Sequence, residues 1–203
     1  METKRQIRAR HLKERNALSL EDRSFWSSKI SQNLIEYFKR RFKICRINGI
    51  YGYYPHGSEV SLTELYDWLL EKEIPLAFPA VKGDAMEFYR VDSMRDFAPG
   101  AFGIMEPVFR REAANFKSAF CLVPGSVFDR FGRRYGYGKG YYDRYFSMHE
   151  GLFRMGIAYA AQVEREIPSE SCDVNMYALA TEEAVTEMPA LAVWKRELSE
   201  TGE

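Results

Sequence analysis

The sequence predicts an α/β fold, namely a single three-layer domain with a mostly parallel central sheet flanked by helices. Short β-branched or aromatic segments alternate with longer segments of helical periodicity, an order typical of parallel sheets covered by helices on both faces. No repeat, low-complexity tract or linker divides the 203 residues, and 46% of them are hydrophobic. We therefore expect one domain over residues 1–203, with the last ten or so residues as candidates for disorder.

The first half of the chain begins the alternation. Helices are expected at residues 2–17, 21–41 and 61–71, and strands at 47–54, 74–78 and 86–91. Ser19 caps the second helix, with Asp22 three residues later in place of the usual Glu of a capping box. Pro55 and Pro79 are expected to stop the first two strands. These elements form the beginning of a β-α-β arrangement.

The second half leads into the most informative segment. A loop rich in Gly and Pro is expected at 98–107, a helix at 141–149, and strands at 119–123, 153–159 and 180–185. The strand at 119–123 is apolar and leads into a glycine-rich stretch. Ligands of such sheets bind at the carboxyl ends of the strands, and the glycine-rich stretch falls there.

Three glycines at alternate positions, Gly136, Gly138 and Gly140, precede the helix that opens with Tyr141 and Tyr142. Glycines let a backbone approach an anion, and a helix N-terminus directs N–H groups and partial positive charge at it. The surrounding cations are Arg130, Arg133, Arg134, Lys139 and Arg144, against only Asp129 and Asp143. This pattern predicts a phosphate-binding site. A β-hairpin or a turn is the alternative interpretation.

Composition excludes several classes of protein. Lys plus Arg and Asp plus Glu both number 29, so nothing indicates a general nucleic-acid binder. Cys45, Cys121 and Cys172 are far apart without a CxxC motif, which predicts a reducing compartment, no disulfides and no zinc site. The charged N-terminus and the lack of a long apolar run predict a soluble, cytoplasmic protein.

Familiar catalytic motifs are missing. Five residues separate Gly132 from Gly138-Lys139, and Gly140 replaces the hydroxyl residue of a P-loop. The pattern G-x-G-x-G late in the chain also differs from a dinucleotide fingerprint. Ser126 lacks the second glycine of a nucleophile elbow. The histidines are scattered and expected at the surface: His11, His56 and His149. Phosphate binding with electrostatic catalysis is what remains.

Several charged residues have two interpretations. Lys4 and Arg8 share one helix face and could be solvated charges. Asp143 could pair with Lys139 or serve as an oxygen ligand of Mg²⁺. Glu59 could be a helix-start carboxylate or a substrate contact, and the residues alone do not choose between these interpretations.

The glycine-rich stretch resembles the signature of the 5-formyltetrahydrofolate cyclo-ligase, or methenyltetrahydrofolate synthetase, family. The strongest match comprises Val123-Pro124-Gly125, Phe128-Asp129, Gly132, Arg134, Gly136, Gly138 and Gly140-Tyr141-Tyr142-Asp143-Arg144. Weaker matches extend over nearly the whole chain: Lys4-x-x-x-Arg8, Ser58-Glu59-Val60, Gly103-Ile104-x-Glu106-Pro107, Ile167-Pro168, Asp173 and Thr181-Glu182.

The resemblance implies an ATP-dependent ligase that converts 5-formyltetrahydrofolate to 5,10-methenyltetrahydrofolate, ADP and phosphate, with Mg²⁺ required. In the family mechanism the formyl oxygen attacks the γ-phosphate to give an N5-iminium phosphate. N10 then attacks the activated carbon, and phosphate leaves. The substrate supplies both nucleophiles, so a protein without a catalytic triad is expected.

The resemblance also implies roles for individual residues. ATP would be held by Lys4, Arg8, Arg134, Gly136, Tyr137, Gly138, Lys139, Gly140, Tyr141 and Tyr142. Lys139 and Arg134 would be catalytic, with Lys139 neutralising charge on the transferring phosphoryl group. Tyr141 and Tyr142 would flank the pterin or the nucleotide, and Glu59 would contact the folate. Asp143 and Asp173 would hold Mg²⁺, directly or through water.

Two departures concern the folate rather than ATP. Ser61 stands where the family often has an acidic or amide residue, and Ala80 where some members have arginine. The departure at Ser61 motivates an alternative class, a protein that binds nucleotide or folate without turnover. RNA binding through residues 130–145 is a second alternative, which the zero net charge disfavours. We expect small-molecule substrates, no nucleic acid or membrane partner, and a monomer or weak homodimer.

Overall fold

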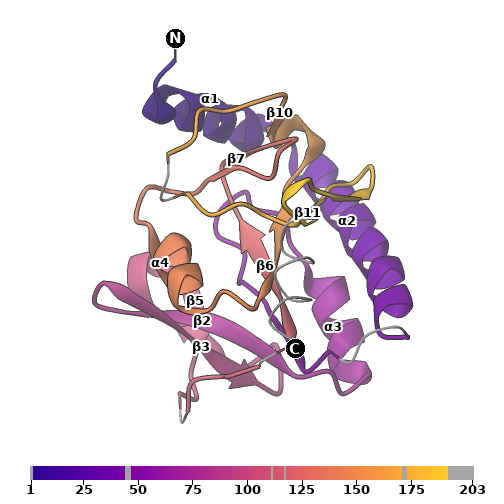
Figure 1. Cartoon of the computed structure of the whole chain (residues 1–203). Helices are drawn as coiled ribbons and strands as arrows, with labels where there is room; N and C mark the ends of the chain where they lie inside the picture. Colours follow the sequence, from indigo (N-terminus) through magenta and orange to yellow (C-terminus); the bar gives the residue numbers. More distant parts are fainter. Residues whose placement is uncertain (1, 44–46, 111, 117, 171–172, 192–203) are drawn as a thin grey trace.

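The structure is a computed structural model that describes residues 2–43, 47–110, 112–116, 118–170 and 173–191 (Figure 1). Its central sheet has seven strands in the order β12-β11-β9-β6-β1-β2-β3. In chain order these are β1 (Gly49–Tyr51), β2 (Leu76–Lys82), β3 (Ala85–Val91), β6 (Ala119–Pro124), β9 (Phe153–Ile157), β11 (Ala178–Ala180) and β12 (Val185–Glu187). The pairs from β2 to β11 are parallel, and both edge strands run antiparallel. The predicted mostly parallel sheet is confirmed.

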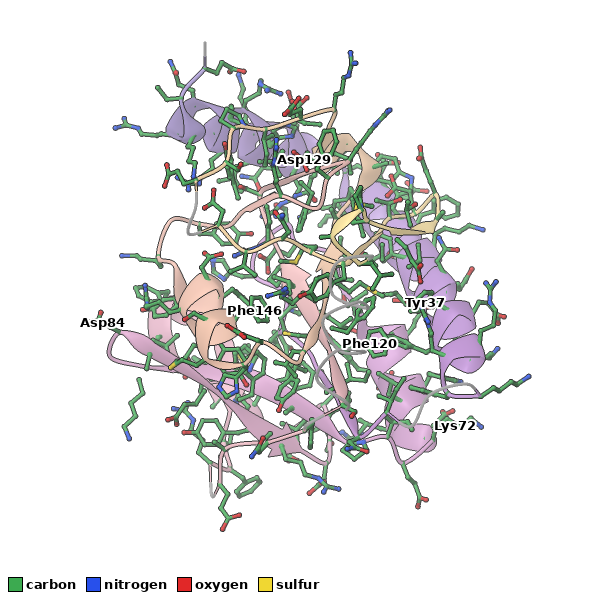
Figure 2. All side chains as sticks on the ribbon, in the orientation of Figure 1. Tyr37, Lys72, Asp84, Phe120, Asp129 and Phe146 are labelled. Carbon is green, nitrogen blue, oxygen red and sulfur yellow. The ribbon has the colours of Figure 1, made fainter. Side chains whose placement is uncertain are left out.

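Helices cover both faces of this sheet (Figure 1). The helices are α1 (Lys4–Ala17), α2 (Leu20–Arg41), α3 (Thr63–Glu71) and α4 (Tyr141–Met148). Successive side chains of a strand point to opposite faces, and β6 shows this alternation. Phe120 and Leu122 join the core beneath α2 and α3, whereas Cys121 joins the core beneath α4. Figure 2 shows Phe120 toward α2 and Phe146 of α4 on the other side of β6.

A smaller layer positions α1. Its sheet has the order β10-β7-β8, with β7 at Val127–Asp129, β8 at Arg134–Tyr135 and β10 at Val163–Glu164. Ile7 of α1 packs there against Val127, Tyr135 and Ile167. The chain also forms two short helices, η1 (Ala101–Gly103) and η2 (Ala160–Gln162). These three strands are too short to give a periodic pattern, and the sequence analysis missed them.

Side-chain hydrogen bonds at the N-caps set where α1 and α2 begin. Thr3 and Gln6 form a reciprocal capping box, so α1 begins at Lys4 rather than at residue 2. The predicted Ser19 cap is confirmed because its hydroxyl accepts the Asp22 N–H at 2.9 Å. The Asp22 carboxylate accepts in turn from the Ser19 hydroxyl.

Several predicted boundaries are wrong: β1 ends at Tyr51, before Pro55, and α3 begins at Thr63 rather than at residue 61. β2 continues through Pro79 to Lys82, because β1 pairs only with its first two residues and leaves the rest as an edge where proline is tolerated. The expected loop at 98–107 contains a hairpin of β4 (Phe97–Pro99) and β5 (Met105–Pro107), turned by Gly103 at a φ of 73°. The strand expected at 180–185 is two strands, β11 and β12, joined by a turn in which the Thr181 N–H donates to the Ala184 carbonyl.

Gly132→Ala is expected to destabilise the fold by about 3 kcal/mol. Gly132 has a φ of 87°, and a β-carbon there would lie 2.3 Å from the backbone oxygen of Met176. Gly83, at a φ of 63°, has open space around it, so Gly83→Ala is the matched control and should cost only about 1 kcal/mol. Urea unfolding of both variants measures the difference. Equal losses of free energy would show that the contact with Met176 is unimportant.

Some predictions concern residues outside the described ranges. Cys45, Cys172 and the last ten residues belong to this group, whereas Cys121 is buried and free. Within the described residues, none of the helices is long and apolar enough to cross a membrane.

Candidate functional site

The glycine segment, residues 136–140, joins β8 to α4 next to the carboxyl ends of the parallel strands. Gly138 and Gly140 have φ values of 87° and 67°, a region that disfavours side chains. Gly140 is the N-cap of α4. The hairpin alternative applies only to the preceding residues, where β7 pairs with β8. The glycine segment itself is a turn into a helix, as a phosphate site requires.

The cations of α1 face this segment. Lys4 Nζ and Arg8 Cζ lie 5.2 and 5.3 Å from the centre of the Tyr135 ring. A β-carbon at Gly138 would lie 3.8 Å from an Arg8 nitrogen. The structure therefore brings together Lys4, Arg8 and the glycine segment, residues that are more than 120 positions apart in the sequence. Interpreting Lys4 and Arg8 as merely solvated charges is wrong.

Arg134 is a buried cation beside the glycine segment, with 7% of its surface exposed. It donates to the Pro124 carbonyl at 3.3 Å, contacts Asp143 at 3.4 Å and lies over the Tyr142 ring. Nε of Arg134 and Nε of Arg8 are both buried without a hydrogen-bond partner among the described residues. Nε of Arg23 is also buried without such a partner, although it has no contact with the glycine segment among the described hydrogen bonds. The two donors at the glycine segment are available to an anionic ligand.

The two carboxylates expected to hold Mg²⁺ are each paired with a cation of the site. Asp143 contacts Arg134 rather than forming the ion pair with Lys139 that one interpretation expected. Asp173 accepts from Lys4 at 2.8 Å. Burial opposes the charged forms of Asp173 and Lys4. The hydrogen bond between them nevertheless lowers the pKa of Asp173, and together with Glu170 it raises the pKa of Lys4. The lowered pKa favours the anionic form of Asp173.

Within the part of the chain that the structure describes, no three His, Cys, Asp or Glu residues gather as a metal site. Mg²⁺ is usually held by one or two carboxylates, water and substrate phosphates. Asp143 and Asp173 would supply carboxylate oxygens to such an ion, although each already contacts a cation, Arg134 or Lys4.

Lys139 in the glycine segment and Tyr141 and Tyr142 directly after it have separate partners. Lys139 is exposed, and its Nζ lies 5.5 Å from the centre of the Phe102 ring. The Tyr141 hydroxyl reaches the Gly83 carbonyl at 3.4 Å. Tyr142 lies against Arg134, and burial raises the pKa of its hydroxyl well above the usual value. Phe102, at a φ of 57° and 62% exposed, was missed by the sequence analysis because nothing local distinguishes it.

Glu59 lies in the loop after β1, ahead of α3, so its interpretation as a helix-start carboxylate is wrong. One carboxylate oxygen accepts the His56 N–H at 2.8 Å, and the other accepts the Tyr137 hydroxyl. Burial raises the pKa of Glu59, although hydrogen bonds from Tyr137 and His56 oppose this. Glu59 is buried, with 8% of its surface exposed. This burial suits a contact inside a binding site.

Two buried polar residues contradict or extend the sequence analysis. His11, expected at the surface, is 3% exposed and contacts Glu164 at 2.9 Å. Arg15 is 5% exposed and donates to Ser58, Gly125 and Tyr137. Of the three buried positions Ile7, His11 and Arg15, only Ile7 is apolar, so no apolar stripe marked this face of α1 as buried.

Ser61 and Ala80, the two positions that differ from the family pattern, lie in different environments. The Ser61 backbone N–H donates to Ser27 at 3.1 Å, and its hydroxyl contacts Thr63. Ala80 is buried in β2, 2% exposed, whereas Lys82 at the end of β2 is exposed. An arginine at position 80 would therefore be buried in this protein.

Comparisons with known proteins agree on one family. A Schizosaccharomyces pombe "Probable 5-formyltetrahydrofolate cyclo-ligase" is 33% identical over 116 residues, 49% of this chain and 57% of that protein. The chain also covers 30% of a Caenorhabditis elegans relative and 47% of a Saccharomyces cerevisiae relative. It thus spans from under a third to just over half of the length of these curated relatives.

Solved structures match over more of the chain. The 5,10-methenyltetrahydrofolate synthetase of Aquifex aeolicus is 37% identical with a TM-score of 0.78, over 91% of this chain and 92% of that one. A Mycoplasma pneumoniae 5,10-methenyltetrahydrofolate synthetase, 24% identical with a TM-score of 0.72 over 89% of this chain and 99% of that one, shares the fold. The model of the 5-formyltetrahydrofolate cyclo-ligase family matches residues 1–182, and the chain therefore belongs to that family.

Proposed function

We propose that this protein catalyses the ATP-dependent cyclisation of 5-formyltetrahydrofolate to 5,10-methenyltetrahydrofolate, with release of ADP and phosphate. Family membership and the name of the 37% identical structure support this reaction. The observation that carries the proposal is the approach of Arg8 and Arg134 to the glycine segment, where the Nε of each is also buried without a hydrogen-bond partner among the described residues. A polyanion such as the ATP triphosphate would provide acceptors for both donors.

Different residues of the site have different roles in this reaction. Lys4, Arg8, Arg134 and the glycine segment bind the phosphates, and Lys139 balances the charge that develops on the transferring phosphoryl group. The formyl oxygen attacks the γ-phosphate, and N10 later displaces phosphate from the activated carbon. The protein contributes positioning and electrostatic stabilisation rather than a nucleophile of its own.

The folate would lie between the aromatic and acidic side chains of the site. Tyr141 and Tyr142 flank the pterin or the nucleotide, and Glu59 contacts the folate. Asp143 and Asp173 would hold Mg²⁺, directly or through water, and the ion would neutralise phosphate charge. A cytoplasmic location and a monomeric or weakly dimeric state stay predictions from the sequence.

The experiment is an absorbance assay for methenyl-folate with purified protein, 5-formyltetrahydrofolate and Mg²⁺, with and without ATP. We expect an absorbance rise that depends on ATP and is accompanied by release of ADP. Folded protein that binds ATP but gives no rise would contradict the proposed reaction and support the binding role without turnover. Heat-inactivated protein is the blank for uncatalysed cyclisation.

A further inference from the structure

The Tyr137 side chain connects the two halves of the proposed site. Its backbone lies in the glycine segment between Gly136 and Gly138. Its hydroxyl accepts from Arg15 at 3.0 Å and contacts the Glu59 carboxylate. One residue therefore contacts both the phosphate-binding backbone and the carboxylate assigned to the folate.

The chemistry of the partners fixes the direction of these hydrogen bonds. A guanidinium can only donate, so the Arg15 N–H uses a lone pair of the Tyr137 hydroxyl. The phenolic proton is then directed at Glu59. The other oxygen of Glu59 accepts the His56 N–H at 2.8 Å, so each oxygen receives one hydrogen bond and keeps a second lone pair. The carboxylate is oriented by these bonds and still has acceptor capacity for a ligand.

Arg15 is the fixed member of this group. Its Nε donates to the Ser58 hydroxyl at 2.9 Å, and another nitrogen donates to the Gly125 carbonyl at 3.1 Å. These contacts tie α1 to the loop after β1 and to the turn after β6. Tyr137 is 48% exposed and has glycines on both sides, and its hydroxyl contacts connect its side chain to Arg15 and Glu59.

We propose that Tyr137 is a positioning residue that couples nucleotide binding to folate binding. Phosphates that order the glycine segment hold the Tyr137 hydroxyl on Glu59, and Glu59 held in this way binds the folate more tightly. By linkage the folate must strengthen nucleotide binding by the same factor. This inference rests on the proposed function, because it takes the glycine segment and Glu59 as the two ligand contacts.

The test is Tyr137→Phe, which keeps the ring and removes only the hydroxyl. Isothermal titration calorimetry gives the Kd of 5-formyltetrahydrofolate with and without a non-hydrolysable ATP analogue. We expect the wild-type Kd to fall about fivefold or more when the analogue is present. In the variant that ratio should approach one, while the analogue alone still binds because the backbone N–H groups of the glycine segment are kept. A ligand coupling that disappears while nucleotide binding persists is not an effect that a merely structural role would produce.

Tyr89→Phe is the matched control, because the Tyr89 hydroxyl also donates to a glutamate, Glu87, but on β3. It should keep the wild-type ratio. Retention of the full ratio in Tyr137→Phe, or a wild-type ratio of one, overturns the inference while the proposed function stands. Wild-type protein that binds neither ligand overturns both.

Discussion

Replacing Lys139 with methionine is expected to lower kcat about a hundredfold, a loss of transition-state stabilisation of about 2.7 kcal/mol. Lys139 is exposed and lies 5.5 Å from the centre of the Phe102 ring, so methionine removes the charge with little change in packing. The free energy of unfolding should stay within about 0.5 kcal/mol of wild type. The measurement combines the methenyl-folate assay at saturating ATP with urea unfolding.

Lys72→Met is the control for this variant, because Lys72 is also exposed but lies at the end of α3 (Figure 2). Its turnover should equal that of wild type. If Lys139→Met keeps most of its turnover, Lys139 does not stabilise the transferring phosphoryl group, and Arg134 is then the remaining cation assigned to catalysis.

The sequence predicts best where the chemistry is local. The buried strand at 119–123 and the helix after Gly140 were found because apolar runs and glycines leave a direct pattern. Pro79 misled the analysis because a proline stops a strand only where its missing N–H is needed. That depends on how far β1 extends beside β2, which is information about a neighbour and not about Pro79.

The same limit applies to the site. The glycine segment was predicted from its own residues, whereas Lys4 and Arg8 needed the family resemblance because α1 is distant in sequence. Arg15 was missed, since its partners Ser58, Gly125 and Tyr137 come from three separate segments. Contacts of this kind depend on the tertiary fold, and a single sequence contains no direct sign of them.

Asp129→Ala is expected to cost about 4 kcal/mol of folding free energy, the largest stability effect predicted for this protein. Asp129 is fully buried at the end of β7, beneath α1 in Figure 2. One carboxylate oxygen accepts the N–H groups of Phe131 and Arg133 at 2.9 Å, and the other accepts the Ile167 N–H at 3.0 Å. Alanine would leave three backbone donors without an acceptor, and each unsatisfied buried donor costs about 1 to 3 kcal/mol.

Asparagine at the same position separates hydrogen bonding from packing. Asp129→Asn keeps one oxygen for two donors but turns an amide toward the Ile167 N–H, so its cost should be about half that of alanine. Asp84→Ala, in the exposed hairpin between β2 and β3, should change the free energy of unfolding by less than about 0.5 kcal/mol. Urea unfolding compares all three variants. A loss in Asp129→Ala no greater than that in Asp84→Ala would show that this turn does not need its carboxylate. The expected loss instead means that the Asp129 carboxylate holds together the turn that leads into β8, the strand that contains Arg134.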